Sequence, residues 1–323
     1  MDRQLCLWST TETRAAPYSR MLTPAAVTAV SLDSSGAYAA TGHADGSLRI
    51  WHVPSPEAAT EAQRAATDPT AVEGYIRLAA EARLPTADAA APGGTARVET
   101  VAFGPAREDG MPWLAVGGHD RLVHVYELQL PAPAAKGGVR PVGEAWRAAS
   151  APRLELVPRG TCRGHGAVVE HVDWSADGRN LISNCSGREA MLWYMPSCQR
   201  VASPGSLASD IAWLERGSVY AFDRIGAWSE GAINSAHASA PELEGAPEGL
   251  LLTAGDAGRL RLFRAPCVVA AAPYREGAAH LERIAAARFV AGGRRGAVSA
   301  GSSDRLLVRW ELVAAAEDGS RRG

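Results

Sequence analysis

The chain has 323 residues, of which 46% are apolar and 21% charged, so it is long enough to bury an extensive core. Its 33 glycines and 20 prolines are typical of a fold with many tight turns, and they favour short strands over long helices. The formal net charge of −2 provides no global positive field, so we expect neither nucleic acid nor an anionic membrane as a partner.

The first predicted element is a strand over residues 3–8, which ends at Trp8 and has no partner strands before it. Units with a shared plan follow it. Each begins with an alternating apolar segment, such as residues 27–32, whose period of two is that of a strand. A small-residue strand, a turn and an aromatic-ended strand come next. Six units are recognised in this way, over residues 27–53, 98–128, 168–195, 210–230, 233–265 and 281–312.

The most regular signal in these units is a turn aspartate six positions before an aromatic residue. It occurs in Asp2 to Trp8, Asp45 to Trp51, Asp120 to Tyr126 and Asp304 to Trp310. The spacing is one residue longer from Asp256 to Phe263, and Gly187 stands where an aspartate would precede Trp193. The unit over residues 210–230 lacks the usual turn aspartate, and it is the most weakly marked of the six.

An inner, a middle and an aromatic-ended third strand that recur in this order are the plan of a β-propeller blade. We therefore predict an all-β fold, a single WD40-type β-propeller over residues 1–323 with six recognisable blades and a partial seventh begun by residues 3–8. Two explanations of that orphan strand remain open. The chain is a fragment or truncated product of a longer protein, or the ring closes irregularly with six blades and a spare strand.

Two low-complexity stretches, residues 54–94 and 131–158, separate the first three units, and we predict flexible insertions there. Residues 71–83 could form a short helix, although its apolar face would be poor. The second insertion has room for one outer strand near residues 153–157.

Some blades of this type contain a hydrogen-bonded chain that joins a histidine before the first strand, a serine or threonine on the second, the turn aspartate and the aromatic residue. Such a chain ties the strands of a blade together. The last unit has all four members, as His280, Ser299, Asp304 and Trp310. The third unit offers His165, Ser183 and Trp193, with Gly187 at the aspartate position. We expect a structural network in both units.

The same residue types could also suggest a hydrolase triad, but the chain has no G-x-S-x-G motif and Ser299 is predicted on a middle strand. The nearest metal-like combination, His119 with Asp120 and His124, lies on one turn and strand and is explained by packing. The chain also has no P-loop. We therefore expect no enzyme, no cofactor and no metal site. Arg294 and Arg295 form a basic turn that could contact an acidic partner.

The start of the chain lacks the apolar run of a signal peptide, and no segment approaches the 18 apolar residues of a membrane span. We expect a cytoplasmic protein without membrane insertion. The five cysteines are odd in number and show no C-x-x-C spacing, so we expect reduced thiols rather than a disulfide framework.

From residue 165 onward the sequence resembles the carboxy-terminal propeller of echinoderm microtubule-associated protein-like proteins. The motifs that carry the resemblance include His165-Gly166, Val172-Asp173-Trp174-Ser175 and the most specific one, Gly226-Ala227-Trp228-Ser229-Glu230-Gly231. Residues 259–263 and 308–312 continue it in the same order.

The resemblance implies a non-catalytic, microtubule-associated scaffold of the cytoskeleton, whose propellers contact tubulin or recruit other proteins, in some cases in cilia. The alternative is an adaptor in an unrelated complex, such as a ubiquitin ligase or a trafficking assembly, because one fold serves many partners.

Overall fold

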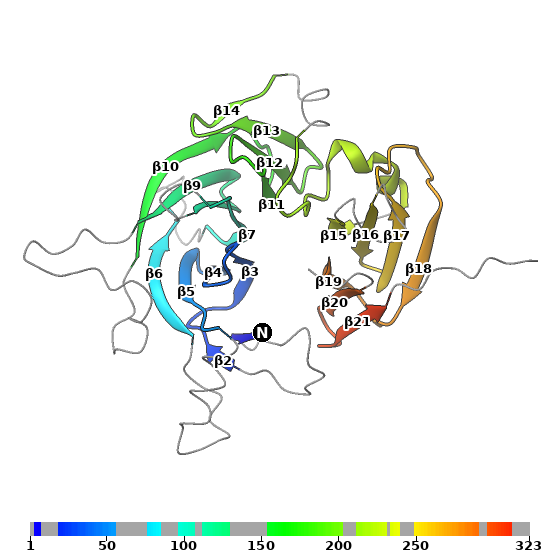
Figure 1. Cartoon of the computed structure of the whole chain (residues 1–323), viewed down its shortest axis with the longest axis horizontal. Coiled ribbons are helices and arrows are strands. Elements are labelled where there is room, and N and C mark those ends of the chain that lie inside the picture. The colour runs from blue at the N-terminus through cyan, green and yellow to red at the C-terminus, as the bar shows by residue number, and fades with distance from the viewer. Residues whose placement is uncertain are drawn as a thin grey trace, which may run out of the picture. The chain divides into compact units, whose positions relative to one another are not determined.

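The computed structural model describes residues 3–7, 19–55, 76–84, 96–106, 112–129, 154–202, 211–230, 233–239, 249–290 and 296–311. These residues are mainly β-strands, which form five sheets of three or four strands and one two-stranded sheet (Figure 1). None of the described helices is long and apolar enough to cross a membrane. The chain divides into two compact units, Met1–Pro204 with Ile211–Leu214, and Gly205–Asp210 with Glu215–Gly323. We take each unit by itself.

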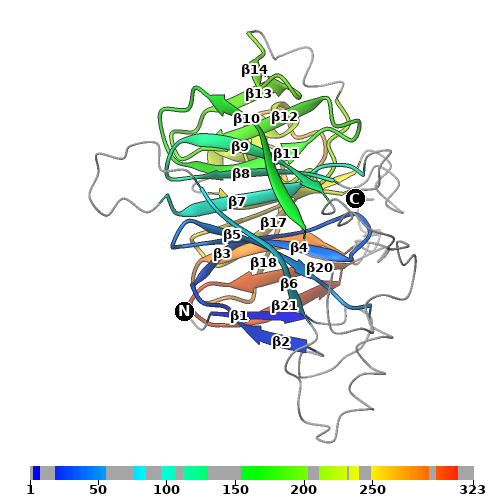
Figure 2. The same ribbon diagram turned by 90° about the vertical axis from the view of Figure 1, so that its left-hand side faces the viewer.

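The first unit contains three antiparallel four-stranded sheets, which we number blades 1 to 3. Blade 1 consists of β3 (Val27–Leu32), β4 (Tyr38–His43), β5 (Ser47–His52) and β6 (Arg77–Arg83). Blade 2 consists of β7 (Val98–Phe103), β8 (Trp113–Gly118), β9 (Leu122–Gln129) and β10 (Glu155–Arg163). Blade 3 consists of β11 (Val169–Trp174), β12 (Asn180–Cys185), β13 (Ala190–Tyr194) and β14 (Gln199–Arg200). Figure 2 faces the outer strands β6 and β10 of this unit.

The second unit contains two sheets, blades 4 and 5. Blade 4 consists of β15 (Ile233–Ala238), β16 (Leu250–Gly255), β17 (Arg259–Arg264) and β18 (Tyr274–Ala278). Blade 5 consists of β19 (Ile284–Phe289), β20 (Gly296–Gly301) and β21 (Leu307–Glu311). Within each of the five sheets the strands pair in chain order, as a propeller blade requires.

The all-β propeller fold is confirmed, but the prediction of six blades plus a partial seventh is wrong, because the described residues form five. The predicted blade over residues 210–230 is absent as a sheet. Its described part contributes one isolated bridge, from Ser175 to Trp213, and the 3₁₀ helix η2 (Phe222–Glu230). The predicted orphan strand has a partner, since β1 (Gln4–Leu7) pairs with β2 (Ser19–Leu22). Trp8 lies outside the described residues.

The backbone around η2 explains why residues 210–230 form no sheet. Arg224 is 2% exposed, and its guanidinium donates to the carbonyls of Arg216 and Ser218 and to the Asp223 carboxylate. The N–H of Gly226 donates to the Cys267 carbonyl at 2.7 Å. These local bonds occupy backbone groups that a strand ladder would need.

The two predicted insertions each contribute an outer strand. Residues 77–83 form β6 rather than part of a short helix, and β6 completes blade 1. The outer strand expected near residues 153–157 is the longer β10, which completes blade 2. Residues 56–75, 85–94 and 131–153 of the insertions lie outside the described residues.

Every inner strand has the same length and the same irregularity. The strands β3, β7, β11, β15 and β19 each have six residues. In each, the pairing with the next strand shifts by one residue immediately after the first pair, as between Val27 and Ala29 or between Val169 and His171. This recurring β-bulge increases the local twist of the blade.

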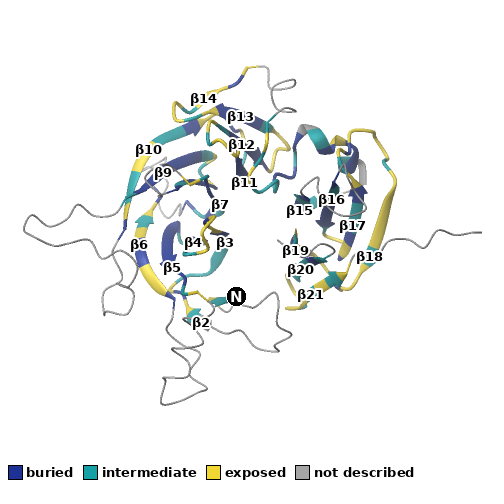
Figure 3. Ribbon diagram, in the orientation of Figure 1, coloured by how far each residue is buried: buried dark blue, intermediate teal, exposed yellow. Residues whose placement is uncertain are grey.

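The hydrophobic core lies between neighbouring sheets. One cluster joins blades 1 and 2 and includes Ile50, Phe103 and Leu114. A second cluster joins blades 2 and 3 and includes Val125 and Trp174, and a third joins blades 4 and 5. The middle strands β4, β8 and β12 of the first unit are accordingly mostly buried, whereas β18 of the second unit is mostly exposed (Figure 3).

Candidate functional site

Blade 5 contains a continuous hydrogen-bonded chain. His280 lies in the segment before β19, and its ring joins Asp304 Oδ2 through Nδ1 at 2.8 Å and Ser299 Oγ through Nε2 at 2.7 Å. Trp310 Nε1 donates to the same Ser299 oxygen at 2.7 Å. All four residues named from the sequence therefore meet in one place. Ser299 is 1% exposed on the middle strand β20, where no substrate can reach it as a nucleophile.

Blade 3 has the same chain without its aspartate. His165 Nε2 lies 2.6 Å from Ser183 Oγ, and Trp193 Nε1 donates to that oxygen at 2.7 Å. The side chain of His165 has no exposed surface, and its Nδ1 atom has no hydrogen-bond partner. The residues predicted from the sequence, His165, Ser183 and Trp193, thus come together, but the Nδ1 atom of His165 has no hydrogen bond within this chain of residues.

Blade 1 builds a related chain from a different histidine. Trp51 Nε1 donates to Thr41 Oγ1 at 2.7 Å, and His43 Nε2 lies 2.8 Å from the same oxygen. His43 comes two residues after Thr41 on the middle strand, so the chain closes on the Ala25 carbonyl instead of on an aspartate. This variant could not be predicted from the spacing, because its histidine lies on the middle strand and not before the first strand.

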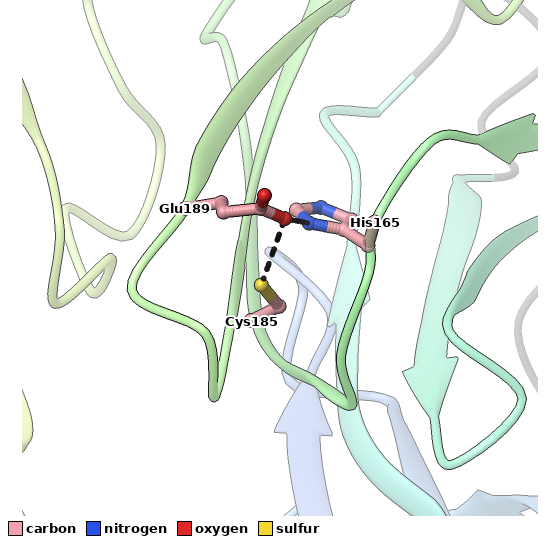
Figure 4. A group of neighbouring side chains, drawn as sticks. All are labelled: His165, Cys185 and Glu189. Carbon is pink, nitrogen blue, oxygen red and sulfur yellow. Dashed lines mark hydrogen bonds and ion pairs between the residues drawn. The ribbon is translucent and has the colours of Figure 1, made fainter.

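The Nδ1 atom of His165 lies close to two further side chains of types that can bind a metal ion, Glu189 and Cys185. The Glu189 Oε2 atom lies 3.7 Å from His165 Nδ1, and the Cys185 thiol donates to the same Oε2 at 3.3 Å (Figure 4). The three ligand atoms all lie within 4.8 Å of one another. We call His165, Cys185 and Glu189 the blade 3 cluster.

A tight hairpin brings two members of the blade 3 cluster together. The N–H of Arg188 donates to the Cys185 carbonyl, and the N–H of Cys185 donates to the Glu189 carbonyl, so the two side chains flank the neck of the turn between β12 and β13. The Gly166 N–H then donates to Glu189 Oε2 at 3.3 Å. Backbone bonds therefore hold both Cys185 and Glu189 opposite His165.

Comparison with blade 5 shows why a cysteine occupies this place. Cys185 pairs with Val169, as Gly301 pairs with Ile284 in blade 5. A Cβ atom on Gly301 would lie 1.9 Å from Asp304 Oδ1 and 2.6 Å from His280 Nδ1. The aspartate carboxylate of blade 5 and the cysteine side chain of blade 3 therefore fill equivalent space beside the histidine.

Burial sets the protonation states of the blade 3 cluster. It lowers the pKa of His165, so the imidazole is neutral, and it raises the pKa of the Cys185 thiol. Hydrogen bonds from the Gly166 N–H and then from the Cys185 thiol lower the pKa of Glu189, which is exposed and ionised. The cluster thus combines a neutral imidazole, a buried thiol and a carboxylate.

The metal-like combination considered from the sequence does not assemble. His124 Nε2 bonds Asp120 Oδ2 at 2.6 Å, and both side chains are nearly buried. His119 turns instead to Glu99, 2.8 Å from its Oε1 atom. The basic pair Arg294 and Arg295 lies outside the described residues.

A second feature recurs at the hairpins that join the middle and third strands. Each hairpin has a residue in the left-handed backbone region, namely Gly46, Arg121, Arg188, Gly258 and Arg305. Glycine is the ordinary choice at such a position, because a side chain there costs roughly 1–2 kcal/mol. Three of the five residues are nevertheless arginines, and all three are exposed. We call Arg121, Arg188 and Arg305 the tip arginines.

Comparison with known proteins gives one consistent family. Residues 1–312 match the family described as the echinoderm microtubule-associated protein second beta-propeller. The human echinoderm microtubule-associated protein-like 2 is 28% identical over 221 residues, which are 68% of this chain and 29% of that protein. The human echinoderm microtubule-associated protein-like 4 is 27% identical over 205 residues, which are 62% of this chain and 18% of that protein. The mouse echinoderm microtubule-associated protein-like 1 is 26% identical over 204 residues, which are 62% of this chain and 22% of that protein. The chain thus spans less than a third of these relatives.

Proposed function

Because the chain belongs to the family of the second β-propeller of echinoderm microtubule-associated protein, we propose that it is a non-catalytic scaffold that binds microtubules or a cytoskeletal protein complex. The observation that carries the proposal is the family match, which extends over residues 1–312. The relatives are named as microtubule-associated proteins, and the proposal extends that association to this chain. We place the role in the cytoplasm, with cilia as one location to examine by imaging.

The buried networks support a structural rather than a catalytic use of the polar residues. Ser183, Ser299 and Thr41 are each at most 1% exposed and each accepts a hydrogen bond from a tryptophan of the same blade. A hydroxyl in that position ties the middle strand to the third strand. Such rigid blades leave the hairpins and loops for contact with partners.

The tip arginines supply a testable docking end in blades 2, 3 and 5. A strained backbone conformation that is kept at an exposed position suggests a function for the side chain. Arginine is also enriched in protein interfaces, where its planar guanidinium can donate two parallel hydrogen bonds to one carboxylate. We therefore propose that the partner presents an acidic surface to these hairpins.

Cosedimentation of the full chain with polymerised microtubules tests both parts of the proposal. The triple variant Arg121→Gly, Arg188→Gly, Arg305→Gly removes three charges and relieves the backbone strain, so it will fold at least as well as the parent. We expect saturable pelleting of the parent chain and at least a tenfold weaker affinity for the variant, which corresponds to about 1.4 kcal/mol.

Arg179→Gly is the matched control. Arg179 is also exposed, with 84% of its side chain accessible, but it lies in the hairpin between β11 and β12, at the opposite end of blade 3. This variant should pellet like the parent. If all proteins pellet alike, the tip arginines are not the docking end. If the parent does not pellet at all, the microtubule proposal fails, and partners captured by affinity purification would decide in favour of an adaptor in another complex.

A further inference from the structure

We propose that the blade 3 cluster is a binding site for a single divalent transition-metal ion of the zinc type, coordinated by His165 Nδ1, Cys185 Sγ and Glu189 Oε2. The site is independent of the docking function proposed above. It would take an ion that accepts nitrogen, sulfur and oxygen ligands together, as Zn²⁺ does.

The spacing of the ligand atoms fits such an ion. A tetrahedral Zn²⁺ with ordinary bond lengths holds its nitrogen, sulfur and oxygen ligands about 3.4–3.6 Å apart. The structure has Nδ1 and Oε2 at 3.7 Å and Sγ and Oε2 at 3.3 Å, with all three atoms within 4.8 Å. Only small movements of side chains are needed to close the triangle around an ion.

The buried imidazole nitrogen is the observation that points to a ligand. His165 has no exposed side-chain surface, and its Nδ1 atom lacks a hydrogen-bond partner. An unsatisfied buried polar atom costs roughly 1–3 kcal/mol, so natural proteins rarely leave one. In blade 5 the corresponding nitrogen is satisfied by Asp304. In blade 3 the residue at that position is Gly187. The Nδ1 atom of His165 faces the Glu189 carboxylate, and Cys185 lies beside that carboxylate (Figure 4).

The surroundings orient the ligands as an outer shell would. Metal-bound histidines usually donate their second ring N–H to a fixed acceptor, and Ser183 Oγ lies 2.6 Å from His165 Nε2. That oxygen has two lone pairs, which suffice for His165 and Trp193 together. The Gly166 N–H steadies the Glu189 carboxylate. Binding would displace the thiol proton of Cys185 to solvent, because the thiolate is the ligand. A water molecule would complete the tetrahedron.

Titration of the metal-free full chain with Co²⁺ and with Zn²⁺ tests the site. We expect one ion per chain, a near-ultraviolet charge-transfer band from the thiolate to Co²⁺, and displacement of that Co²⁺ by Zn²⁺. Cys185→Ser should abolish the band. Glu189→Gln should weaken Zn²⁺ binding by at least the roughly 10- to 100-fold that accompanies loss of an outer-shell partner. Glu189 is exposed, so this variant leaves the fold intact even if Cys185→Ser does not.

Cys267→Ser is the matched control, because Cys267 is a second buried thiol, 2% exposed, that lies in the other compact unit. It should keep the stoichiometry, the band and the affinity of the parent chain. The proposal is overturned if the parent binds no stoichiometric ion, if Glu189→Gln binds Zn²⁺ as tightly as the parent, or if Cys267→Ser removes the band as Cys185→Ser does.

Discussion

At the scale of single residues, the most strongly shifted histidine lies in blade 4. Burial, and then the charges of Arg288, Arg224 and Arg216, lower the pKa of His237 to about 3. The N–H of Phe289 donates to its Nδ1 atom at 3.1 Å, which links β15 to β19. The ring is therefore a neutral hydrogen-bond acceptor between two blades.

This shift predicts that acid destabilises the second unit through His237. The unfolded chain takes up a proton near pH 6.5 and the folded chain near pH 3, so the free energy of unfolding falls as the pH drops from about 6.5 towards 3 and is level above that range. The slope approaches about 1.4 kcal/mol per pH unit, or about 2 kcal/mol between pH 7 and pH 5. Urea unfolding at both pH values should show that His237→Gln is less pH-sensitive than the parent by this amount.

The same measurement on Ser302→Ala provides the control, because this change lies in the same compact unit and removes an exposed hydroxyl but no titratable group. Its unfolding should depend on pH much as that of the parent does. If His237→Gln also follows the parent curve, the imidazole does not stay neutral in the fold.

The hydrogen-bonded chain of blade 5 makes a second prediction at this scale. Ser299→Ala removes the acceptor of Trp310 Nε1 and the partner of His280 Nε2, so a buried donor is left unpaired. We expect a loss of about 1–3 kcal/mol in the free energy of unfolding. Ser302→Ala, which removes an exposed hydroxyl bonded to the Arg283 carbonyl, should change it by no more than about 0.5 kcal/mol. Equal losses in thermal or urea unfolding would contradict a tying role for the network.

At the scale of elements, η2 depends on one close backbone approach. A Cβ atom on Gly226 would lie 2.1 Å from the Val269 carbonyl oxygen and 3.0 Å from that of Cys267. Gly226→Ala should therefore push η2 away from residues 267–269 and cost about 1–3 kcal/mol in unfolding free energy. Gly166→Ala is the matched control, since no atom lies within 4 Å of its Cβ position and alanine should cost little there. Similar stability of the two variants would show that η2 can yield at this contact.

Elements were predictable from sequence where one pattern decides them. The period-two segments at residues 27–32, 98–103, 169–174 and 284–289 coincide with inner strands, because alternation places one face of each strand in a core. Residues 210–230 also alternate in part. Their conformation depends instead on hydrogen bonds from the Arg224 side chain and on the close backbone contact at Gly226, and the periodicity of the sequence reveals neither. The strand β6 was not predicted because its buried residues, Ala79 and Ala80, are adjacent and its one leucine, Leu78, is exposed, so it shows no period-two pattern.

The candidate site was predictable only in part, for a similar reason. The histidine, serine and tryptophan positions follow from spacing, and Gly187 marked the missing aspartate. That Cys185 and Glu189 take up the vacant space depends on the shape of one hairpin, with Arg188 in a left-handed conformation. A cysteine where the other middle strands of blades 2, 4 and 5 end in glycine is the one signal that could have revealed it.

At the scale of the whole molecule, apolar clusters lie between neighbouring sheets of each unit. Leu114 in β8 is fully buried in the cluster that joins blades 1 and 2. We expect Leu114→Ala to cost about 2–5 kcal/mol and to speed amide hydrogen exchange in β3–β5 as well as in β7–β9. Leu78→Ala, at a site that is 46% exposed, should change stability by no more than about 0.5 kcal/mol. If exchange rises in β7–β9 alone, the two blades do not share a core.

The repeated bulge of the inner strands carries a consequence for how such chains can change in length. Deleting the extra residue, Thr28 in β3, would restore regular pairing there, yet it would turn the residues on one side of the deletion to the opposite face of the sheet. Growth by insertion is instead accommodated between third and fourth strands, where 24 residues separate β5 from β6 and 25 separate β9 from β10. Gains and losses of residues during evolution should therefore be frequent at those connections and almost forbidden in the inner strands.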